Sequence, residues 1–128
     1  MQGSPAVIRV LLADDDTSFV EFLRRLIDQQ PELTVVGTAH DGLAAIELAE
    51  NVMPDAVVMD LHMPLLDGVS AVARLRRDVP HLCLIALTGD GDPELHRAVS
   101  EAGADAVLLK GDLLQNLVER LSAIRTPA

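Results

Sequence analysis

Short apolar runs alternate with longer amphipathic segments along this chain. Runs of this kind, almost wholly apolar and bounded by turn residues, are typical of strands that are buried on both faces of a parallel sheet. The strands predicted in this way are residues 7–13, 33–38, 56–60, 82–88 and 106–109. The pattern therefore predicts five strands, each followed by a helical segment.

Apolar residues recur at helical spacing after these strands, and Pro31, Pro80 and Gly103 are expected to end three of the helices. The second helix is predicted over residues 43–52 and the third over 68–78. The inward-facing residues predicted for the first, third, fourth and fifth helices are Phe19, Phe22, Leu23, Leu26 and Ile27; Val69, Val72, Leu75 and Val79; Leu95, Ala98, Val99 and Ala102; and Leu114, Leu117, Val118, Leu121 and Ile124.

Strict alternation of strand and helix predicts an α/β fold in which an open parallel sheet carries helices on both faces. For five strands the expected order is 2-1-3-4-5. A length of 128 residues, 49% of them hydrophobic, suits one domain with a proper core. We assign this domain to residues 7–124, with 1–6 as a disordered lead-in and 125–128 as a tail or the start of a linker to an output domain.

The composition argues against several classes of function. Twenty acidic against ten basic residues give a formal charge of −10, which repels phosphate backbones and disfavours direct binding of nucleic acid. Phe19 and Phe22 are the only aromatic residues, so platforms for stacking bases are missing as well. No apolar run is long enough to span a bilayer, and no signal region precedes the first strand. We therefore expect a soluble, cytoplasmic protein that does not bind membranes.

Polar residues stand at the carboxyl ends of four expected strands. Asp14 and Asp15 follow the first strand, Asp60 ends the third, Thr88 ends the fourth and Lys110 follows the fifth. Parallel strands present these ends at one edge of the sheet, where ligands bind near the point at which the strand order reverses. Three neighbouring carboxylates would raise one another's pKa unless a divalent cation joins them, and oxygen-only ligands favour Mg²⁺ or Mn²⁺.

The same residues supply the parts needed to transfer a phosphoryl group onto an aspartate. Asp60 would be the nucleophile, while the metal, the Lys110 ammonium and the Thr88 hydroxyl would contact the phosphoryl oxygens. Lys110 is the only lysine among ten basic residues. A compact ammonium on a flexible stem can pair with Asp60 at rest and reach a phosphoryl oxygen afterwards.

Four segments at these strand ends resemble the receiver domain of bacterial two-component response regulators, over roughly residues 6–124. The matching segments are VLLADDD (10–16), VVMDLHMPLLDG (57–68), ALTG (86–89) and GADAVLLK (103–110). This resemblance implies a flavodoxin-like fold, also called CheY-like. The sequence Leu-Leu-Lys with no Pro after it is most similar to receivers of the NarL/FixJ type, which precede helix-turn-helix output domains.

The resemblance also implies a function and a role for each site residue. Asp60 would accept a phosphoryl group from a sensor histidine kinase, and Asp14 and Asp15 would hold Mg²⁺ together with Asp60 and the backbone carbonyl of His62. Phosphorylation would shift the face formed by the fourth helix, fifth strand and fifth helix. An output domain, expected to be transcriptional, or a partner would read that face; a homodimer would form through it or through the first and fifth helices. The chain would be a regulatory phosphoacceptor and not an enzyme.

The chain departs from the family pattern at a few positions. Val107 stands three residues before Lys110, where the family usually has an aromatic residue or His that moves together with the residue at Thr88. Gly89 adds backbone freedom after the fourth strand. His62 and Asp90 occupy positions where the family tunes hydrolysis of the aspartyl phosphate, and Asp90 would either repel the phosphoryl group or orient the attacking water.

Simpler interpretations of the single residues stay open. Asp60 could cap the following loop, Thr88 could be an ordinary β-branched strand residue, and Lys110 could be a solvated charge. For the first acidic run, Asp16 or Thr17 is better placed to cap the first helix than the two preceding acids.

Two other functions also stay open. A receiver-like interaction module that works without phosphorylation would account for Val107. Alternatively, Asp14-x-Asp16 after an apolar strand resembles the nucleophile and acid of haloacid-dehalogenase-like phosphatases. That second match is incomplete, because Ser18 stands where Thr or Val is expected and Asp60 has no role.

Overall fold

The computed structural model describes residues 7–63, 65–89 and 91–124, with the backbone alone for 112–115. The expected lead-in 1–6, the tail 125–128, Pro64 of the third-strand motif and Asp90 lie outside the described residues, as does the side chain of Leu114. Among the described residues no helix combines the length and the apolar character needed to cross a membrane.

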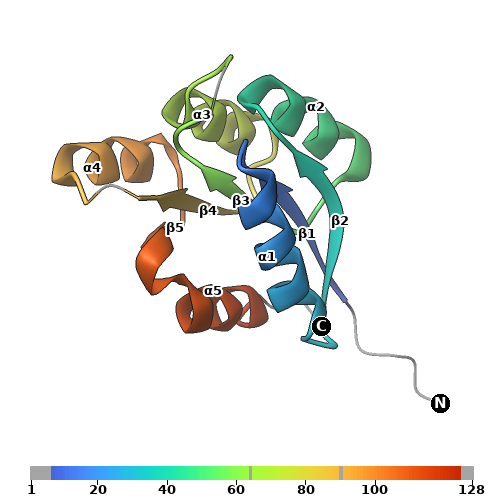
Figure 1. Ribbon diagram of the computed structural model, residues 1–128. Helices are drawn as coiled ribbons and strands as arrows, with labels where there is room; N and C mark the ends of the chain where they lie inside the picture. Colours follow the sequence, from blue (N-terminus) through green and yellow to red (C-terminus); the bar gives the residue numbers. More distant parts are fainter. Residues whose placement is uncertain (1–6, 64, 90, 125–128) are drawn as a thin grey trace.

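In the described part of the chain five strands and five helices alternate, as the sequence pattern predicts (Figure 1). The strands are β1 (Ile8–Ala13), β2 (Leu33–Ala39), β3 (Ala56–Asp60), β4 (Cys83–Thr88) and β5 (Ala106–Leu109). The helices are α1 (Thr17–Asp28), α2 (Gly42–Val52), α3 (Gly68–Asp78), α4 (Pro93–Ala102) and α5 (Leu113–Ser122), and a short 3-10 turn, η1 (Lys110–Asp112), precedes α5. All neighbouring strands are parallel, in the order β2-β1-β3-β4-β5, which confirms the predicted topology.

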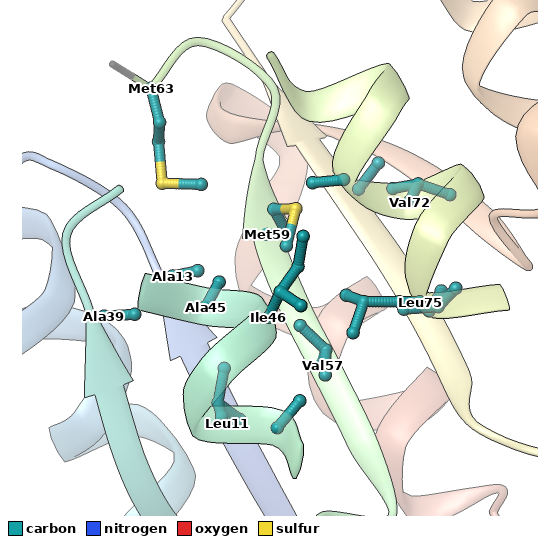
Figure 2. Close-up of a cluster of buried hydrophobic side chains, with 14 of the residues drawn as sticks. Leu11, Ala13, Ala39, Ala45, Ile46, Val57, Met59, Met63, Val72 and Leu75 are labelled. Carbon is teal, nitrogen blue, oxygen red and sulfur yellow. The ribbon is translucent and has the colours of Figure 1, made fainter. Parts of the chain in front are cut away.

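Two apolar clusters sandwich the sheet. Helices α2, α3 and α4 cover one face and α1 and α5 the other, as Figure 1 shows. Along β1, Leu11 faces the first cluster and Leu12 the second, because successive strand residues point to opposite faces. Figure 2 shows the first cluster, where Ile46 of α2 and Leu75 of α3 meet Val57 of β3. Burial on both faces explains why the strands appear as continuous apolar runs.

Two predicted inward positions are wrong. Phe22 is 45% exposed, and the buried residues of α1 are Val20, Leu23 and Ile27. Ala98 is exposed as well, because α4 packs at the edge of the sheet against α3 and β5 and fully buries only Val99. Helical spacing alone leaves the centre of the buried stripe uncertain by one position, and packing decides it.

Aspartates begin four of the helices. Their side chains accept a hydrogen bond from a backbone N–H in the first turn, which satisfies a donor that the helix itself cannot pair. The pairs are Asp16 with Phe19 (3.2 Å), Asp41 with Ala44 (2.7 Å), Asp67 with Ser70 (2.8 Å) and Asp92 with Glu94 (2.9 Å). The expected capping role of Asp16 is confirmed, and Asp14, Asp15 and Asp60 are not used in this way.

Candidate functional site

Three carboxylates converge beyond the carboxyl ends of β1 and β3. The two strands are neighbours, and Ala13 pairs with Met59, which places Asp14 beside Asp60. One carboxylate oxygen from each of Asp14, Asp15 and Asp60 lies within 4.8 Å of the others. Asp14 is 1% and Asp60 4% exposed, whereas Asp15 is exposed. The structure thus brings together the three acids that the sequence placed at one edge.

Lys110 reaches this cluster from η1, directly after β5. Its Nζ lies 2.8 Å from Asp14 Oδ2 and 3.5 Å from Asp60 Oδ2. The sequence led us to expect a resting pair between Lys110 and Asp60; that ion pair is present, but the shorter contact is to Asp14. The ammonium therefore bridges two buried carboxylates and compensates part of their charge.

Burial is the largest influence on the acid–base behaviour of Asp60. It raises the pKa of Asp60, and the nearby charge of Asp14 acts in the same direction. The backbone N–H of His62, which donates to Asp60 Oδ1 at 3.2 Å, and the charge of Lys110 oppose this rise without cancelling it. Burial alone would lower the pKa of Lys110, but the hydrogen bond with Asp14 and the charges of both acids raise it overall. The charged ammonium of Lys110 thus lies beside two carboxylates, Asp14 and Asp60, that are largely excluded from water.

Hydrogen bonds hold both the side chain and the backbone of Asp14 in place. The backbone N–H of Asp16 donates to Asp14 Oδ1 at 2.9 Å, and His40 Nδ1 lies 3.1 Å from the backbone oxygen of Asp14. His40 is exposed, but its ring also touches the end of β1. Asp16 turns to cap α1. The Asp14-x-Asp16 pattern therefore does not bring two carboxylates into the cluster, which argues against the phosphatase alternative.

Thr88 lies at the end of β4, beside β3, and is fully buried. Its Oγ1 is 3.4 Å from Nε2 of His62, at the edge of hydrogen-bonding distance. Sequence reasoning considered His62 only for its backbone carbonyl and its position, and did not predict this contact. The sequence feature that could have indicated this contact is the position of His62, two residues after the Asp that ends β3. A histidine side chain there is long enough to reach the end of the neighbouring strand.

An aromatic ring lies beside Lys110, although Val107 replaces the aromatic residue expected three positions before it. The Phe19 ring centroid is 4.4 Å from Lys110 Nζ. Val107 is partly buried and packs against the cluster under α2, α3 and α4. Beyond β4, a Cβ placed on Gly89 would meet no atom within 4 Å, which leaves space around this loop residue. No pattern in the sequence predicts that Phe19 faces Lys110, because their contact depends on how α1 packs.

The donor set suits a hard divalent cation. Carboxylate oxygens alone make up the acidic cluster, and Mg²⁺ and Mn²⁺ prefer oxygen ligands and keep part of their water shell. The imidazole of His62 lies against Thr88 and is not a member of the cluster. The cluster therefore has the chemistry of a magnesium site and not of a zinc site.

Comparison with known proteins gives consistent results. Transcriptional regulatory protein PrrA of Mycobacterium leprae (strain TN) is 40% identical over 119 residues, which cover 91% of this chain and 49% of that protein. Protein-glutamate methylesterase/protein-glutamine glutaminase 4 of Myxococcus xanthus (strain DK1622) is 38% identical over 111 residues, 86% of this chain and 31% of that protein. This chain thus spans about a third to a half of the length of these curated relatives.

A solved structure shares the fold over nearly the whole chain. The signal receiver domain of the response regulator NarL from Mycobacterium tuberculosis superposes with a TM-score of 0.84 at 27% identity, covering 94% of this chain and 100% of that one. The family model described as the response regulator receiver domain matches residues 10–122. The match includes both acidic strand ends, Thr88 and Lys110, and the chain belongs to the response regulator receiver domain family.

Proposed function

We propose that Asp60 is the phosphoacceptor of this receiver and that Asp14, Asp15, Asp60 and the backbone carbonyl of His62 hold the divalent cation. One observation carries the proposal: three carboxylates lie within 4.8 Å of one another, and the ammonium of Lys110 contacts two of them. Bound Mg²⁺ or Mn²⁺ would neutralise negative charge on the phosphoryl oxygens and the carboxylates.

The chain's own residues then act on a phosphohistidine of a sensor kinase. A carboxylate oxygen of Asp60 attacks phosphorus, the bond from phosphorus to the imidazole nitrogen breaks, and its electron pair stays on that nitrogen, which takes up a proton from solvent. Asp60 must be ionised to attack, and the N–H of His62 and the ammonium of Lys110 favour that form. Lys110 and the hydroxyl of Thr88 contact phosphoryl oxygens in the product. The Lys110 ammonium already lies 3.5 Å from Asp60.

The phosphorylated site controls an output in this proposal. The receiver unit comprises residues 7–124, acts in the cytoplasm, and is a regulatory phosphoacceptor and not itself an enzyme. The surface of α4, β5 and α5 is read by an output domain or by a second copy of the chain, with a dimer through α1 and α5 as the other arrangement. A transcriptional output is supported by the likeness to PrrA and to the NarL receiver; the methylesterase named for the Myxococcus relative belongs to that protein.

A second candidate function follows from Val107. This side chain is partly buried against the cluster under α2, α3 and α4, and it lacks the polar tip and the size of the usual aromatic. An interaction module could bind phosphate at its site without changing the face formed by α4, β5 and α5. Such a module would not require an aromatic residue at position 107, so Val107 would be sufficient there. In that case binding at Asp60 and the change of the distant face are uncoupled.

Titration with beryllofluoride and Mg²⁺, followed by amide chemical shifts, tests both proposals. The first predicts shifts at the carboxyl ends of β1, β3 and β4 and also along α4, β5 and α5, with no response in Asp60→Asn. Asp28→Asn, an exposed acid at the end of α1, is the matched control and should respond like the wild type. Shifts confined to the site, with an unchanged oligomeric state by light scattering, would support the second. No shifts in the wild type would contradict both.

A further inference from the structure

Among the residues that the structure describes, the ammonium of Lys110 has three close neighbours. Two are carboxylates, Asp14 Oδ2 at 2.8 Å and Asp60 Oδ2 at 3.5 Å. The third is the ring of Phe19 in α1, whose centroid is 4.4 Å from Nζ, with the ammonium over the ring. Phe19 is one of only two phenylalanines in a chain without Tyr or Trp, and its ring lies against the only lysine.

The position of the ring is set by the fold. Phe19 packs partly buried against the cluster that joins α1 and α5 to the sheet, and the Phe22 ring lies 6.1 Å away at a tilt of 31°. Asp16 fixes the start of α1 through its hydrogen bond to the backbone N–H of Phe19 itself. The same acidic segment that leaves β1 thus holds the aromatic ring beside the site.

An aromatic face attracts a cation within roughly 6 Å of its centroid, and the attraction grows when the cation is partly removed from water. The side chain of Lys110 is 25% exposed, so water reaches it on a limited part of its surface. Lysine has a flexible four-carbon stem and three equivalent donors, so its head group needs neighbours on several sides to stay in one place. The ring of Phe19 adds a third neighbour to the two carboxylates.

We propose that Phe19 is a positioning residue that holds the Lys110 ammonium at the acidic site, ready for the phosphoryl group. This proposal rests on the proposed function for its consequence, but the contact itself exists without phosphate. When the ring is removed, the ammonium samples more rotamers and spends less time beside Asp60. Binding of a phosphoryl mimic and phosphorylation both become weaker.

The sole lysine allows a direct test in the unphosphorylated protein. Lysine labelled with carbon-13 gives one set of side-chain signals, all from Lys110. Protons that lie over a ring face are shifted upfield, so the ε-methylene protons of the wild type should resonate upfield of those in a short lysine peptide. Phe19→Leu should remove this shift, while Phe22→Leu should keep it. A wild-type signal at the peptide position would overturn the proposal without any variant.

The functional consequence is tested with beryllofluoride affinity and with the rate of phosphorylation by acetyl phosphate. Phe19→Leu keeps an apolar side chain for the α1 packing but has no ring, and should weaken both by roughly two- to ten-fold. Phe19→Tyr should restore them, a rescue that a purely structural role for a buried apolar group would not require. Phe22→Leu should match the wild type.

The outcomes separate this proposal from the proposed function. If wild-type protein responds to beryllofluoride and Phe19→Leu responds equally well, the positioning role is wrong and the proposed function stands. If the wild type does not respond at all, the proposed function is wrong. The Lys110 signal then still decides whether Phe19 holds the ammonium.

Discussion

His62 Nε2 lies 3.4 Å from Thr88 Oγ1, so a side chain from the loop after β3 contacts the hydroxyl at the end of β4. In the proposed mechanism that hydroxyl contacts the phosphoryl group. The imidazole therefore competes with the phosphoryl group for Thr88. Because Val107 replaces the usual aromatic partner, we predict that the imidazole of His62 moves when this hydroxyl moves.

Replacing the imidazole should make the phosphorylated form easier to reach. In His62→Ala the backbone carbonyl proposed to bind the cation stays, but the contact with Thr88 is gone. We predict a roughly two- to five-fold higher affinity for beryllofluoride with Mg²⁺, the equivalent of one weak hydrogen bond in the resting state. Isothermal titration measures it. His81→Ala, which alters an exposed histidine after α3, should leave the affinity unchanged, and a lower affinity in His62→Ala would contradict the prediction.

Asp60→Asn should stabilise the unphosphorylated protein at neutral pH. Burial raises the pKa of Asp60 above its ordinary value of 3.8, so the fold disfavours the ionised carboxyl. This destabilisation is absent at pH below 3.8, develops as the pH rises through the raised pKa, and is complete above it. The amide of Asn carries no charge, so the Asp60→Asn protein does not have this destabilisation.

Urea denaturation of both proteins across this pH range, with EDTA present, checks the prediction. The free energy of unfolding of Asp60→Asn should exceed that of the wild type at pH 7, and the difference should shrink towards zero as the pH falls below 3.8. A difference that stays constant with pH would show that Asp60 ionisation is not its cause. Asp28→Asn is the control for changing an exposed carboxylate.

Arg76 connects α3 to the start of β4 and to the turn between α4 and β5. Its guanidinium donates to the backbone oxygens of Gly103 (3.0 and 2.8 Å), Pro80 (2.6 Å) and Leu82 (2.8 Å) and to Asp105 Oδ2 (2.8 Å). Arg76→Met keeps most of the stem but leaves these acceptors without the guanidinium, so we predict a loss of about 2–4 kcal/mol in the free energy of unfolding. Urea denaturation measures it.

The neighbouring residue supplies the control. Arg77 is exposed and pairs with its neighbour Asp78 at 3.1 Å, so Arg77→Met should change stability by less than about 0.5 kcal/mol. Equal effects of the two substitutions would contradict the role given to Arg76.

Gly68 begins α3 where the loop after β3 turns back against itself. A Cβ there would lie 2.6 Å from the Cα of Leu61 and 3.0 Å from its carbonyl oxygen. Gly68→Ala should therefore lower the free energy of unfolding, measured by urea denaturation, by about 1–3 kcal/mol. This loss is expected although alanine has a higher helix propensity than glycine. Gly91→Ala, with no atom within 4 Å of the new Cβ, is the control and should be nearly neutral. A neutral Gly68→Ala would show that the loop can shift without cost.

The strand order and the meeting of the site residues could be predicted from the sequence, because apolar runs mark buried strands and a parallel sheet gathers their carboxyl ends. The contacts made by Phe19, His40 and the ring of His62 could not. They depend on rotamers and on how α1 and the loop after β3 pack, and neither leaves a periodic signal. The same reason applies to α1, where the spacing predicts Phe22 and not Val20 as inward, whereas the structure exposes Phe22 and buries Val20. Spacing predicts the width of an apolar stripe better than its centre.

Cation-dependent phosphorylation of Asp60, which forms an acyl phosphate, is tested most directly by intact mass after incubation with acetyl phosphate. The proposal predicts that wild-type protein with Mg²⁺ gains one phosphoryl group, that EDTA prevents the gain, and that Asp60→Asn shows none while Asp28→Asn behaves like the wild type. A wild-type protein that gains no mass, or an Asp60→Asn protein that gains the same mass, would contradict the account.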